Sequence, residues 1–119
     1  METLLHLLLV DDDALVLQAQ QRIFSKYFHL LKAENYDQAW TILQTRHVDI
    51  VLSDYDMPGK NGGMLLQAIK QTYPHIRRFL NSGSSPRDLP NLLASGVAEK
   101  FFEKPTIVND FVQVLGLPV

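Results

Sequence analysis

The chain contains no cysteine among its 119 residues, which excludes disulfide bonds and thiolate metal sites. It also lacks an excess of charge of either sign. The formal net charge is -2, which gives no reason to expect this domain to bind nucleic acid or an acidic membrane. The apolar run at residues 4–10 is too short to span a bilayer and has no basic segment before it. We therefore expect a cytoplasmic protein and interpret this run as a buried strand.

Five apolar runs alternate with segments that have the spacing of amphipathic helices. The runs that predict strands cover residues 5–10, 29–33, 49–53, 76–80 and 100–103. A chain of this length fits one domain. Strict alternation of strands and helices predicts a doubly wound α/β fold, with a parallel sheet covered by helices on both faces.

Apolar spacing also predicts the buried face of each long helix. The four stripes are Leu15, Ala19, Ile23 and Tyr27; Tyr36, Ala39, Trp40 and Leu43; Leu65, Ile69 and Tyr73; and Val108, Phe111, Val112 and Leu115. Two prolines restrict the fourth helix to residues 89 to about 95, where Gly96 can end it. The residues expected to cap helix starts are Asp13, Asn35, Asp88 and Thr106.

Polar residues follow four of the predicted strands. Asp11 and Asp12 follow the first, Asp54 the third, Ser82 the fourth and Lys104 the fifth. The carboxyl edge of an open α/β sheet is where such folds bind ligands. Crowded carboxylates repel one another, and a hard cation such as Mg²⁺ relieves that repulsion. A carboxylate nucleophile, a metal site, a cation and a hydroxyl donor together indicate phosphoryl transfer through an aspartyl phosphate.

The chain resembles the receiver domain of two-component response regulators over nearly its whole length. The segments that carry the resemblance are Leu-Leu-Val-Asp-Asp-Asp at 8–13, Asp-Tyr-Asp-Met-Pro-Gly-Lys-Asn-Gly at 54–62, Ser82-Gly83 and Phe-Phe-Glu-Lys-Pro at 101–105. Each motif alone is weak, but their order and their position after apolar strands make the set specific. The resemblance implies a flavodoxin-like (βα)5 fold with strand order 2-1-3-4-5.

The resemblance also assigns roles around a bound Mg²⁺. Asp54 corresponds to the phosphoacceptor, and its carboxylate is also expected to contribute to the metal site. Asp12 corresponds to a direct metal ligand, Asp11 to a ligand that acts through water, and the backbone carbonyl of Asp56 to a further ligand. The carboxylate of Asp56 lies two residues after the phosphoacceptor, and we expect it to alter the lifetime of the phosphorylated state.

Two further residues are expected to contact the phosphoryl group. Lys104 would pair with its oxygens, and Ser82 would donate a hydrogen bond and move on phosphorylation, which would draw Phe101 inward. The resemblance also implies a cis peptide between Lys104 and Pro105. Besides Asp56, two positions depart from the family pattern: Lys60 stands where an apolar residue is common, and Phe101 lacks the hydroxyl of the more frequent tyrosine.

The implied function is a signalling switch. A sensor histidine kinase or a histidine phosphotransfer protein would phosphorylate Asp54, and the surface formed by the fourth helix, fifth strand and fifth helix would change for a partner or an attached output domain. The domain would catalyse only its own phosphorylation and dephosphorylation, so we do not expect an enzyme. We expect one receiver domain over residues 1–119 with no output domain, and a homodimer through the output surface is compatible with the family. The kinase, the pathway and the effector are not specified by the sequence.

Two alternatives stay open at this point. One is a pseudo-receiver, an interaction module of the same fold that does not accept phosphate. The other is a phosphatase of the haloacid dehalogenase type, because Asp54-Tyr55-Asp56 resembles the Asp-x-Asp pair of those enzymes. Their acidic metal pair follows the lysine in sequence, however, whereas Asp11 and Asp12 precede the nucleophile here.

The four histidines show no metal-ligand spacing and are interpreted as structural or exposed: His6, His29, His47 and His75.

Overall fold

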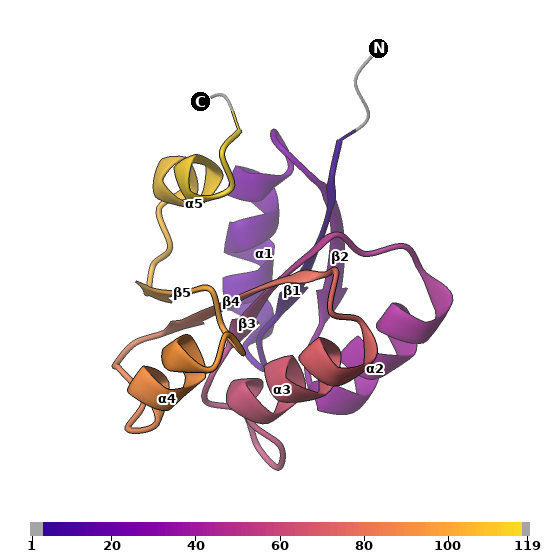
Figure 1. The fold of residues 1–119 in the computed structure, drawn as a ribbon. Coiled ribbons are helices and arrows are strands. Elements are labelled where there is room, and N and C mark those ends of the chain that lie inside the picture. The colour runs from indigo at the N-terminus through magenta and orange to yellow at the C-terminus, as the bar shows by residue number, and fades with distance from the viewer. Residues whose placement is uncertain (1–3, 118–119) are drawn as a thin grey trace.

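Five parallel strands alternate with five helices in the computed structural model, which describes residues 4–117. The strands are β1 (His6–Val10), β2 (His29–Ala33), β3 (Ile50–Asp54), β4 (Arg77–Ser82) and β5 (Lys100–Glu103). The helices are α1 (Ala14–Phe24), α2 (Tyr36–Thr45), α3 (Gly62–Thr72), α4 (Leu89–Ala94) and α5 (Val108–Val114). The strand order is β2-β1-β3-β4-β5, so the predicted fold class and topology are confirmed (Figure 1). No helix within residues 4–117 is long and apolar enough to cross a membrane.

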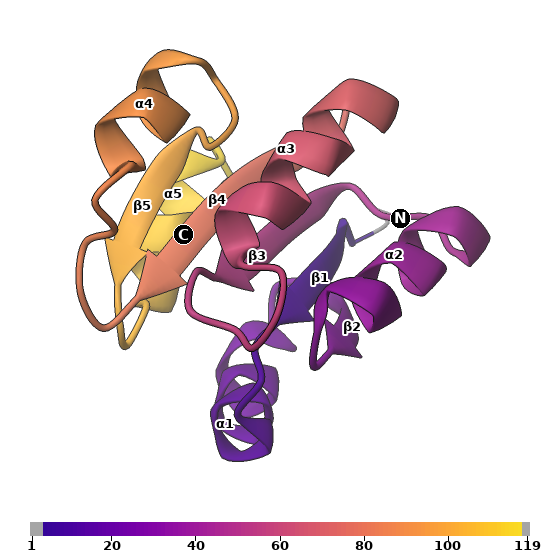
Figure 2. The same cartoon turned by 90° about the horizontal axis from the view of Figure 1, so that it is seen from below.

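The helices form two layers, with α1 and α5 on one face of the sheet and α2, α3 and α4 on the other (Figure 2). Side chains of a strand alternate between the two faces. In β1, Leu7 and Leu9 pack in the core beneath α1 and α5, while Leu8 and Val10 pack in the core beneath the other three helices. A strand buried on both faces is apolar at every position, and for that reason the first strand could be predicted from an unbroken apolar run.

Aromatic rings dominate the core beneath α1 and α5. Phe111 of α5 lies at its centre, with ring-centroid distances of 5.3 Å to Phe79, 5.5 Å to Phe102, 5.6 Å to Phe24 and 5.8 Å to Phe28. Its side chain is fully buried. Such edge-to-face contacts add to the free energy gained from burying the rings. The predicted stripe of the last helix is therefore confirmed at its central residue.

The predicted stripe of α1 is wrong. Leu17 and Phe24 are the buried residues of this helix, whereas Leu15 is 73% exposed and Ile23 is 47% exposed. The sequence of α1 is apolar on two sides, and periodicity alone does not tell which side meets the sheet. Packing of Phe24 into the aromatic core decides the orientation, so a second apolar face remains at the surface.

Two of the predicted helix caps are confirmed together with their side-chain hydrogen bonds. Asp13 Oδ1 accepts hydrogen bonds from the backbone amides of Leu15 and Val16, at 2.9 and 3.4 Å. Asn35 Oδ1 accepts one from the amide of Gln38 at 2.8 Å. These bonds satisfy amides that have no partner inside the helix.

Asp88 is the N-cap of α4 as predicted, since the helix begins at Leu89 and Gly96 follows it with φ +76°. The prediction of Thr106 as the cap of α5 is wrong, because Ile107 holds that position. Asp88 makes no cap hydrogen bond, because its carboxylate accepts one from the Tyr55 hydroxyl at 2.9 Å. Thr106 lies before the start of α5, and its Oγ1 accepts a hydrogen bond from the side-chain amide of Asn81 at 3.1 Å. In both cases a side chain distant in sequence competes with the local backbone.

Candidate functional site: an acidic cluster with a buried lysine

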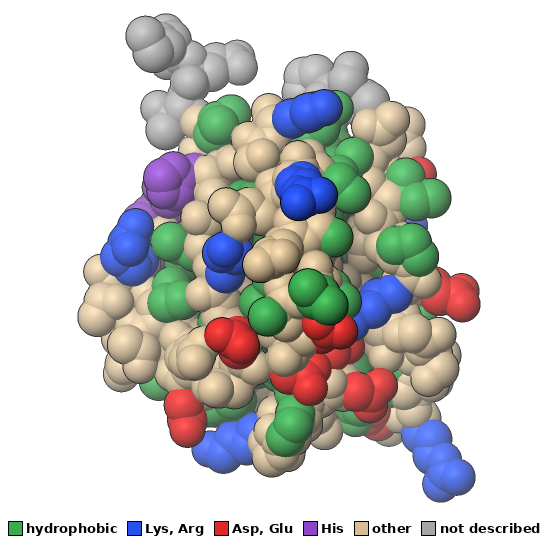
Figure 3. Space-filling view, turned by 180° about the vertical axis from the view of Figure 1, so that it is seen from behind, with side chains coloured by type: hydrophobic (Ala, Val, Ile, Leu, Met, Phe, Trp, Pro, Cys, Tyr) green, Lys and Arg blue, Asp and Glu red, His purple; other side chains and the backbone are tan. Residues whose placement is uncertain are grey.

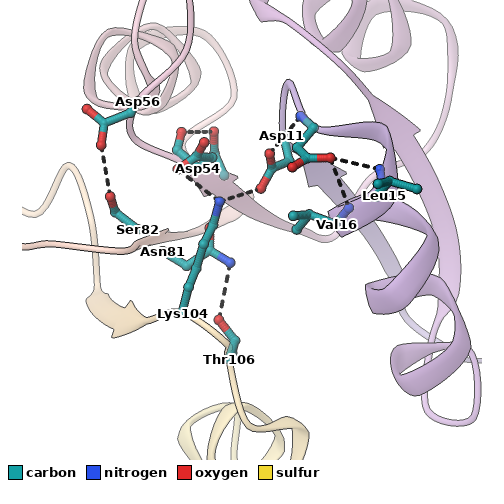
Figure 4. A network of polar contacts seen from close by, with 11 residues as sticks. Asp11, Leu15, Val16, Asp54, Asp56, Asn81, Ser82, Lys104 and Thr106 are labelled. Atoms are coloured by element: carbon teal, nitrogen blue, oxygen red, sulfur yellow. Dashed lines mark hydrogen bonds and ion pairs between the residues drawn. The ribbon is translucent and has the colours of Figure 1, made fainter.

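The predicted site residues from three strands meet at the carboxyl edge of the sheet. Asp11 directly follows β1, Asp54 is the last residue of β3, and Lys104 directly follows β5. The Lys104 Nζ atom lies 2.7 Å from Asp11 Oδ2 and 3.4 Å from Asp54 Oδ1, and it points between the two carboxylates (Figure 4). Asp11 is 1% exposed. A buried carboxylate pair is thus held around one ammonium group.

Asp12 completes a candidate metal centre. Its side chain is exposed, and one carboxylate oxygen each from Asp11, Asp12 and Asp54 lie within 4.8 Å of one another. The amide of Asp13 donates to Asp11 Oδ1 at 2.9 Å and fixes the Asp11 carboxylate. Three carboxylates and one ammonium carry a net charge of -2 when all are ionised. Oxygen ligands with unbalanced negative charge suit Mg²⁺, which needs few protein ligands and keeps several waters.

The ionisation of Asp54 reflects this crowding. Burial, followed by the negative charge of Asp11, raises the pKa of the Asp54 carboxyl from 3.8 to about 6, and Lys104 opposes this rise. Burial disfavours the charge of Lys104 as well, but the hydrogen bond and charge of Asp11, with the charge of Asp54, raise the pKa of its ammonium. The ammonium therefore stays charged, while ionised Asp54 carries a cost that a nearby cation would relieve.

Ser82 and Asp56 make a contact that the sequence did not indicate. Ser82 is the last residue of β4, and its buried Oγ donates a hydrogen bond to Asp56 Oδ2 at 3.0 Å (Figure 4). The Asp56 carboxylate thus points at Ser82 and is not one of the three grouped carboxylates of residues 4–117. The metal contact assigned to its backbone carbonyl stays a prediction.

The loop that carries Lys104 is held by hydrogen bonds to the end of β4. The Lys104–Pro105 peptide bond is cis, as predicted. Asn81 of β4 is buried, and its side-chain amide donates to Thr106 Oγ1. The Lys104 amide donates to the carbonyl of Ser82 at 2.9 Å. These bonds tie the backbone of Lys104 and the side chain of Thr106 to the end of β4.

Gly62 is packed against the backbone of the candidate phosphoacceptor. A Cβ atom added at this position would lie 2.2 Å from the carbonyl oxygen of Asp54 and 3.0 Å from the Tyr55 Cα. The Gly62 amide donates to the carbonyl of Tyr55 at 2.9 Å. Only a residue without a side chain lets α3 begin this close to the end of β3.

The sequence matches the family model of the response regulator receiver domain over residues 7–115. The chain belongs to this family. It is 27% identical to the transcriptional regulatory protein CitT of Bacillus subtilis and 32% identical to the sensor kinase/phosphatase LuxN of Vibrio campbellii. The alignments cover 94% and 92% of this chain, but 51% of CitT and 13% of LuxN. The receiver thus spans about half the length, or less, of these curated relatives.

Solved structures agree with the family assignment. The signal receiver domain of an HD-domain protein from Pseudomonas fluorescens Pf-5 has a TM-score of 0.87 and 29% identity, with 96% of this chain and 93% of that chain covered. A CheY-like receiver domain from Methanospirillum hungatei has a TM-score of 0.86 at 18% identity, covers 96% of this chain and 92% of its own, and supports the fold alone. Receiver domains typically bind Mg²⁺ at an acidic pocket, and the acidic cluster of this receiver has suitable donors.

A groove opens next to the acidic cluster of the receiver. It has a volume of about 340 Å³ and lies between α1 and the loop after β5, where its apolar lining includes Val16, Ala19, Ile23 and Pro105. Lys104 also lines it. The face of α1 that was predicted to be buried, and that lies at the surface, therefore borders the candidate phosphorylation site.

Proposed function

We propose that this receiver is a phosphorylation-dependent switch of a two-component system or phosphorelay, in which Asp54 accepts a phosphoryl group with the help of Mg²⁺. The observation that carries this proposal is the position of Lys104 Nζ, 2.7 Å from Asp11 and 3.4 Å from Asp54. The arrangement provides a nucleophile, a metal site and a counter-charge for the transferred group. Membership of the receiver family favours this function over the phosphatase alternative.

The chemistry follows from the donors around Asp54. A carboxylate oxygen of Asp54 attacks the phosphorus of a phosphohistidine on a sensor histidine kinase or a phosphotransfer protein. An O–P bond forms, the P–N bond breaks, and the imidazole leaves with its electron pair and takes up a proton. Asp11, Asp12 and the carbonyl of Asp56 would hold Mg²⁺, which would neutralise charge on the phosphoryl oxygens. Lys104 would bind one of those oxygens in place of the Asp54 carboxylate.

The phosphodonor is proposed to dock on the groove between α1 and the loop after β5. This groove borders Lys104, so a donor lying there reaches the acidic cluster directly. Leu15 and Ile23 give α1 an exposed apolar face. An amphipathic helix of the donor that carries the phosphohistidine matches such a surface, since helices bury apolar faces in grooves of this kind.

The switch is proposed to act through Ser82. Its hydroxyl is bonded to Asp56 in the unphosphorylated receiver and would leave that partner to donate to the phosphoryl group. Phe101, which is partly buried, pairs in the sheet with Leu80 of the neighbouring strand β4. Movement at the end of β4 would shift the equilibrium between two arrangements of the surface formed by α4, β5 and α5. A full switch from 1:99 to 99:1 needs roughly 5.5 kcal/mol of preference for one arrangement.

Incubation with acetyl phosphate tests the proposal with the simplest donor. Intact-mass spectrometry of the wild-type chain should show one phosphoryl group per molecule in the presence of Mg²⁺ and none in the presence of EDTA. Circular dichroism of both samples checks that the chelator leaves the fold intact. An unmodified mass with Mg²⁺ present and the fold intact would refute phosphoacceptance and favour the pseudo-receiver alternative.

Replacing Asp56 with Asn is expected to lengthen the lifetime of the phosphorylated receiver by roughly fivefold. The substitution removes a negative charge beside the phosphoryl group and weakens the competing hydrogen bond of Ser82 by about 1 kcal/mol, the difference between a charged and a neutral acceptor. The decay of the phosphorylated species is followed by mass after removal of the donor. Equal decay rates of wild type and Asp56→Asn would show that the Asp56 carboxylate does not influence the phosphoryl group.

A further inference from the structure

Three of the four histidines meet at the amino edge of the sheet, although their sequence spacing indicated no site. His6 and His29 begin β1 and β2 and are paired in register, and His47 lies in the loop between α2 and β3. The ring centroid of His6 lies 4.4 Å from that of His29 and 5.0 Å from that of His47. The fold thus brings together histidines that the sequence spacing does not connect.

Asp49 joins this group and is held in a fixed orientation. The backbone amide of His6 donates to Asp49 Oδ2 at 2.7 Å, and the amide of Asp49 donates to the carbonyl of His6 at 2.9 Å. The same Oδ2 lies 3.6 Å from His6 Nδ1, while Oδ1 lies 2.9 Å from His47 Nε2. The carboxylate thus presents its two oxygens toward two different imidazoles.

We infer that His6, His47 and Asp49 form a binding site for a transition-metal dication of the zinc type. One ligand atom from each residue lies within 4.8 Å of the others. Two ligands of a tetrahedral zinc, each about 2.0–2.1 Å from the metal, are roughly 3.3 Å apart. The separations of 2.9 Å from Asp49 Oδ1 to His47 Nε2 and 3.6 Å from Asp49 Oδ2 to His6 Nδ1 are close to that value, and they use the two different oxygens of the carboxylate. We expect the exposed His47 side chain to rotate so that both imidazoles and Asp49 meet one ion.

The choice of metal follows from the donor atoms. Two imidazole nitrogens and one carboxylate oxygen favour zinc, nickel or copper over Mg²⁺, which prefers oxygen alone. Three protein ligands leave a coordination position for water. His29 packs on His6 and would hold its ring in place.

This site is separate from the acidic cluster. Asp49 precedes β3 and Asp54 ends it, and five residues of strand span roughly 16 Å. The space-filling view shows histidine side chains (purple) in its upper part and the main group of acidic side chains (red) in its lower part (Figure 3). The inference does not depend on phosphorylation, so either proposal can fail without the other.

Calorimetric titration of the tag-free chain with ZnCl₂ tests the site. Excess Mg²⁺ is present throughout to saturate the acidic cluster, and the variants are His47→Ala and the matched control His75→Ala. His47 is 67% exposed and lies in a loop, so its removal leaves the core intact. We expect one zinc per wild-type chain, an affinity at least about tenfold weaker in His47→Ala, and no change in His75→Ala.

Histidine ring resonances in the NMR spectrum identify the ligands independently. Zinc should shift or broaden the resonances of His6 and His47 and leave that of His75 unchanged. The inference is overturned if the wild-type chain binds no zinc, if His47→Ala binds it as tightly as wild type, or if Asp12→Asn rather than His47→Ala removes the binding. In each of these cases the contact between His47 and Asp49 is an ordinary surface contact.

Discussion

Replacing Asp54 with Asn is expected to abolish phosphorylation by acetyl phosphate and, at the same time, to stabilise the metal-free protein. An amide has no nucleophilic oxygen of carboxylate strength, so no phosphoryl adduct should form. The stability gain follows from charge. Burial and Asp11 raise the pKa of Asp54 from 3.8 to about 6, and this rise corresponds to a cost of up to about 3 kcal/mol for the ionised group.

The cost of ionised Asp54 to the free energy of unfolding depends on pH. Because the folded protein holds the Asp54 proton more tightly than the unfolded chain does, the contribution of Asp54 to the free energy of unfolding should fall as the pH rises from about 4 to about 6. Above that range the full cost is present, and the neutral Asn avoids it. Asp54→Asn should therefore unfold at higher urea concentration than wild type at neutral pH in EDTA, and Mg²⁺ should reduce the difference.

Intact-mass spectrometry and urea unfolding in EDTA measure the two halves of this prediction on the same samples. Asp13→Asn is the matched control, because Asp13 is an exposed helix cap that asparagine can replace. It should keep both phosphorylation and stability near wild type. Adduct formation in Asp54→Asn would place the phosphoacceptor elsewhere. A less stable Asp54→Asn protein would mean that the ionised Asp54 carboxylate does not lower the free energy of unfolding.

Replacing Phe111 with Ala is expected to lower the free energy of unfolding by about 3–5 kcal/mol. Its ring is fully buried and contacts four other phenylalanines. Removing it deletes buried apolar surface and leaves a cavity that surrounding β-strands cannot readily fill. Domains of this kind are stabilised by only about 5–15 kcal/mol in total, so a large part of the stability should be lost.

Urea unfolding followed by circular dichroism gives this difference directly. Ile107→Ala serves as the control, because Ile107 precedes the same helix but is 61% exposed. Its effect should stay within about 0.5 kcal/mol of wild type. A loss below about 1 kcal/mol in Phe111→Ala would indicate that α5 contributes little to the core.

Much of the fold could be predicted because the strands are buried on both faces. Residues 7–10 and 50–52 are apolar without interruption, which marks central parallel strands. The meeting of Asp11, Asp54 and Lys104 could be predicted for a related reason: parallel strands bring their carboxyl ends to one edge of the sheet. The order of strands came from the family resemblance, since the apolar pattern does not fix it.

The features that could not be predicted depend on contacts between distant segments. The apolar pattern of α1 fits two orientations, and only the packing of Phe24 selects one. The hydrogen bond between Ser82 and Asp56 joins residues 26 positions apart, and no local sequence pattern predicts it. The histidine cluster likewise requires the register of β1 with β2 together with the course of the loop before β3.

The close packing of Gly62 on the carbonyl of Asp54 has a consequence for how this chain can diverge. Gly62 has no side chain to contribute a functional group, yet the space that a methyl group would need is occupied by the main chain of residue 54. Many surface residues around this loop can be substituted, whereas any substitution of Gly62 would displace the backbone of Asp54. The most constrained neighbour of the candidate phosphoacceptor is thus a residue that has no side chain.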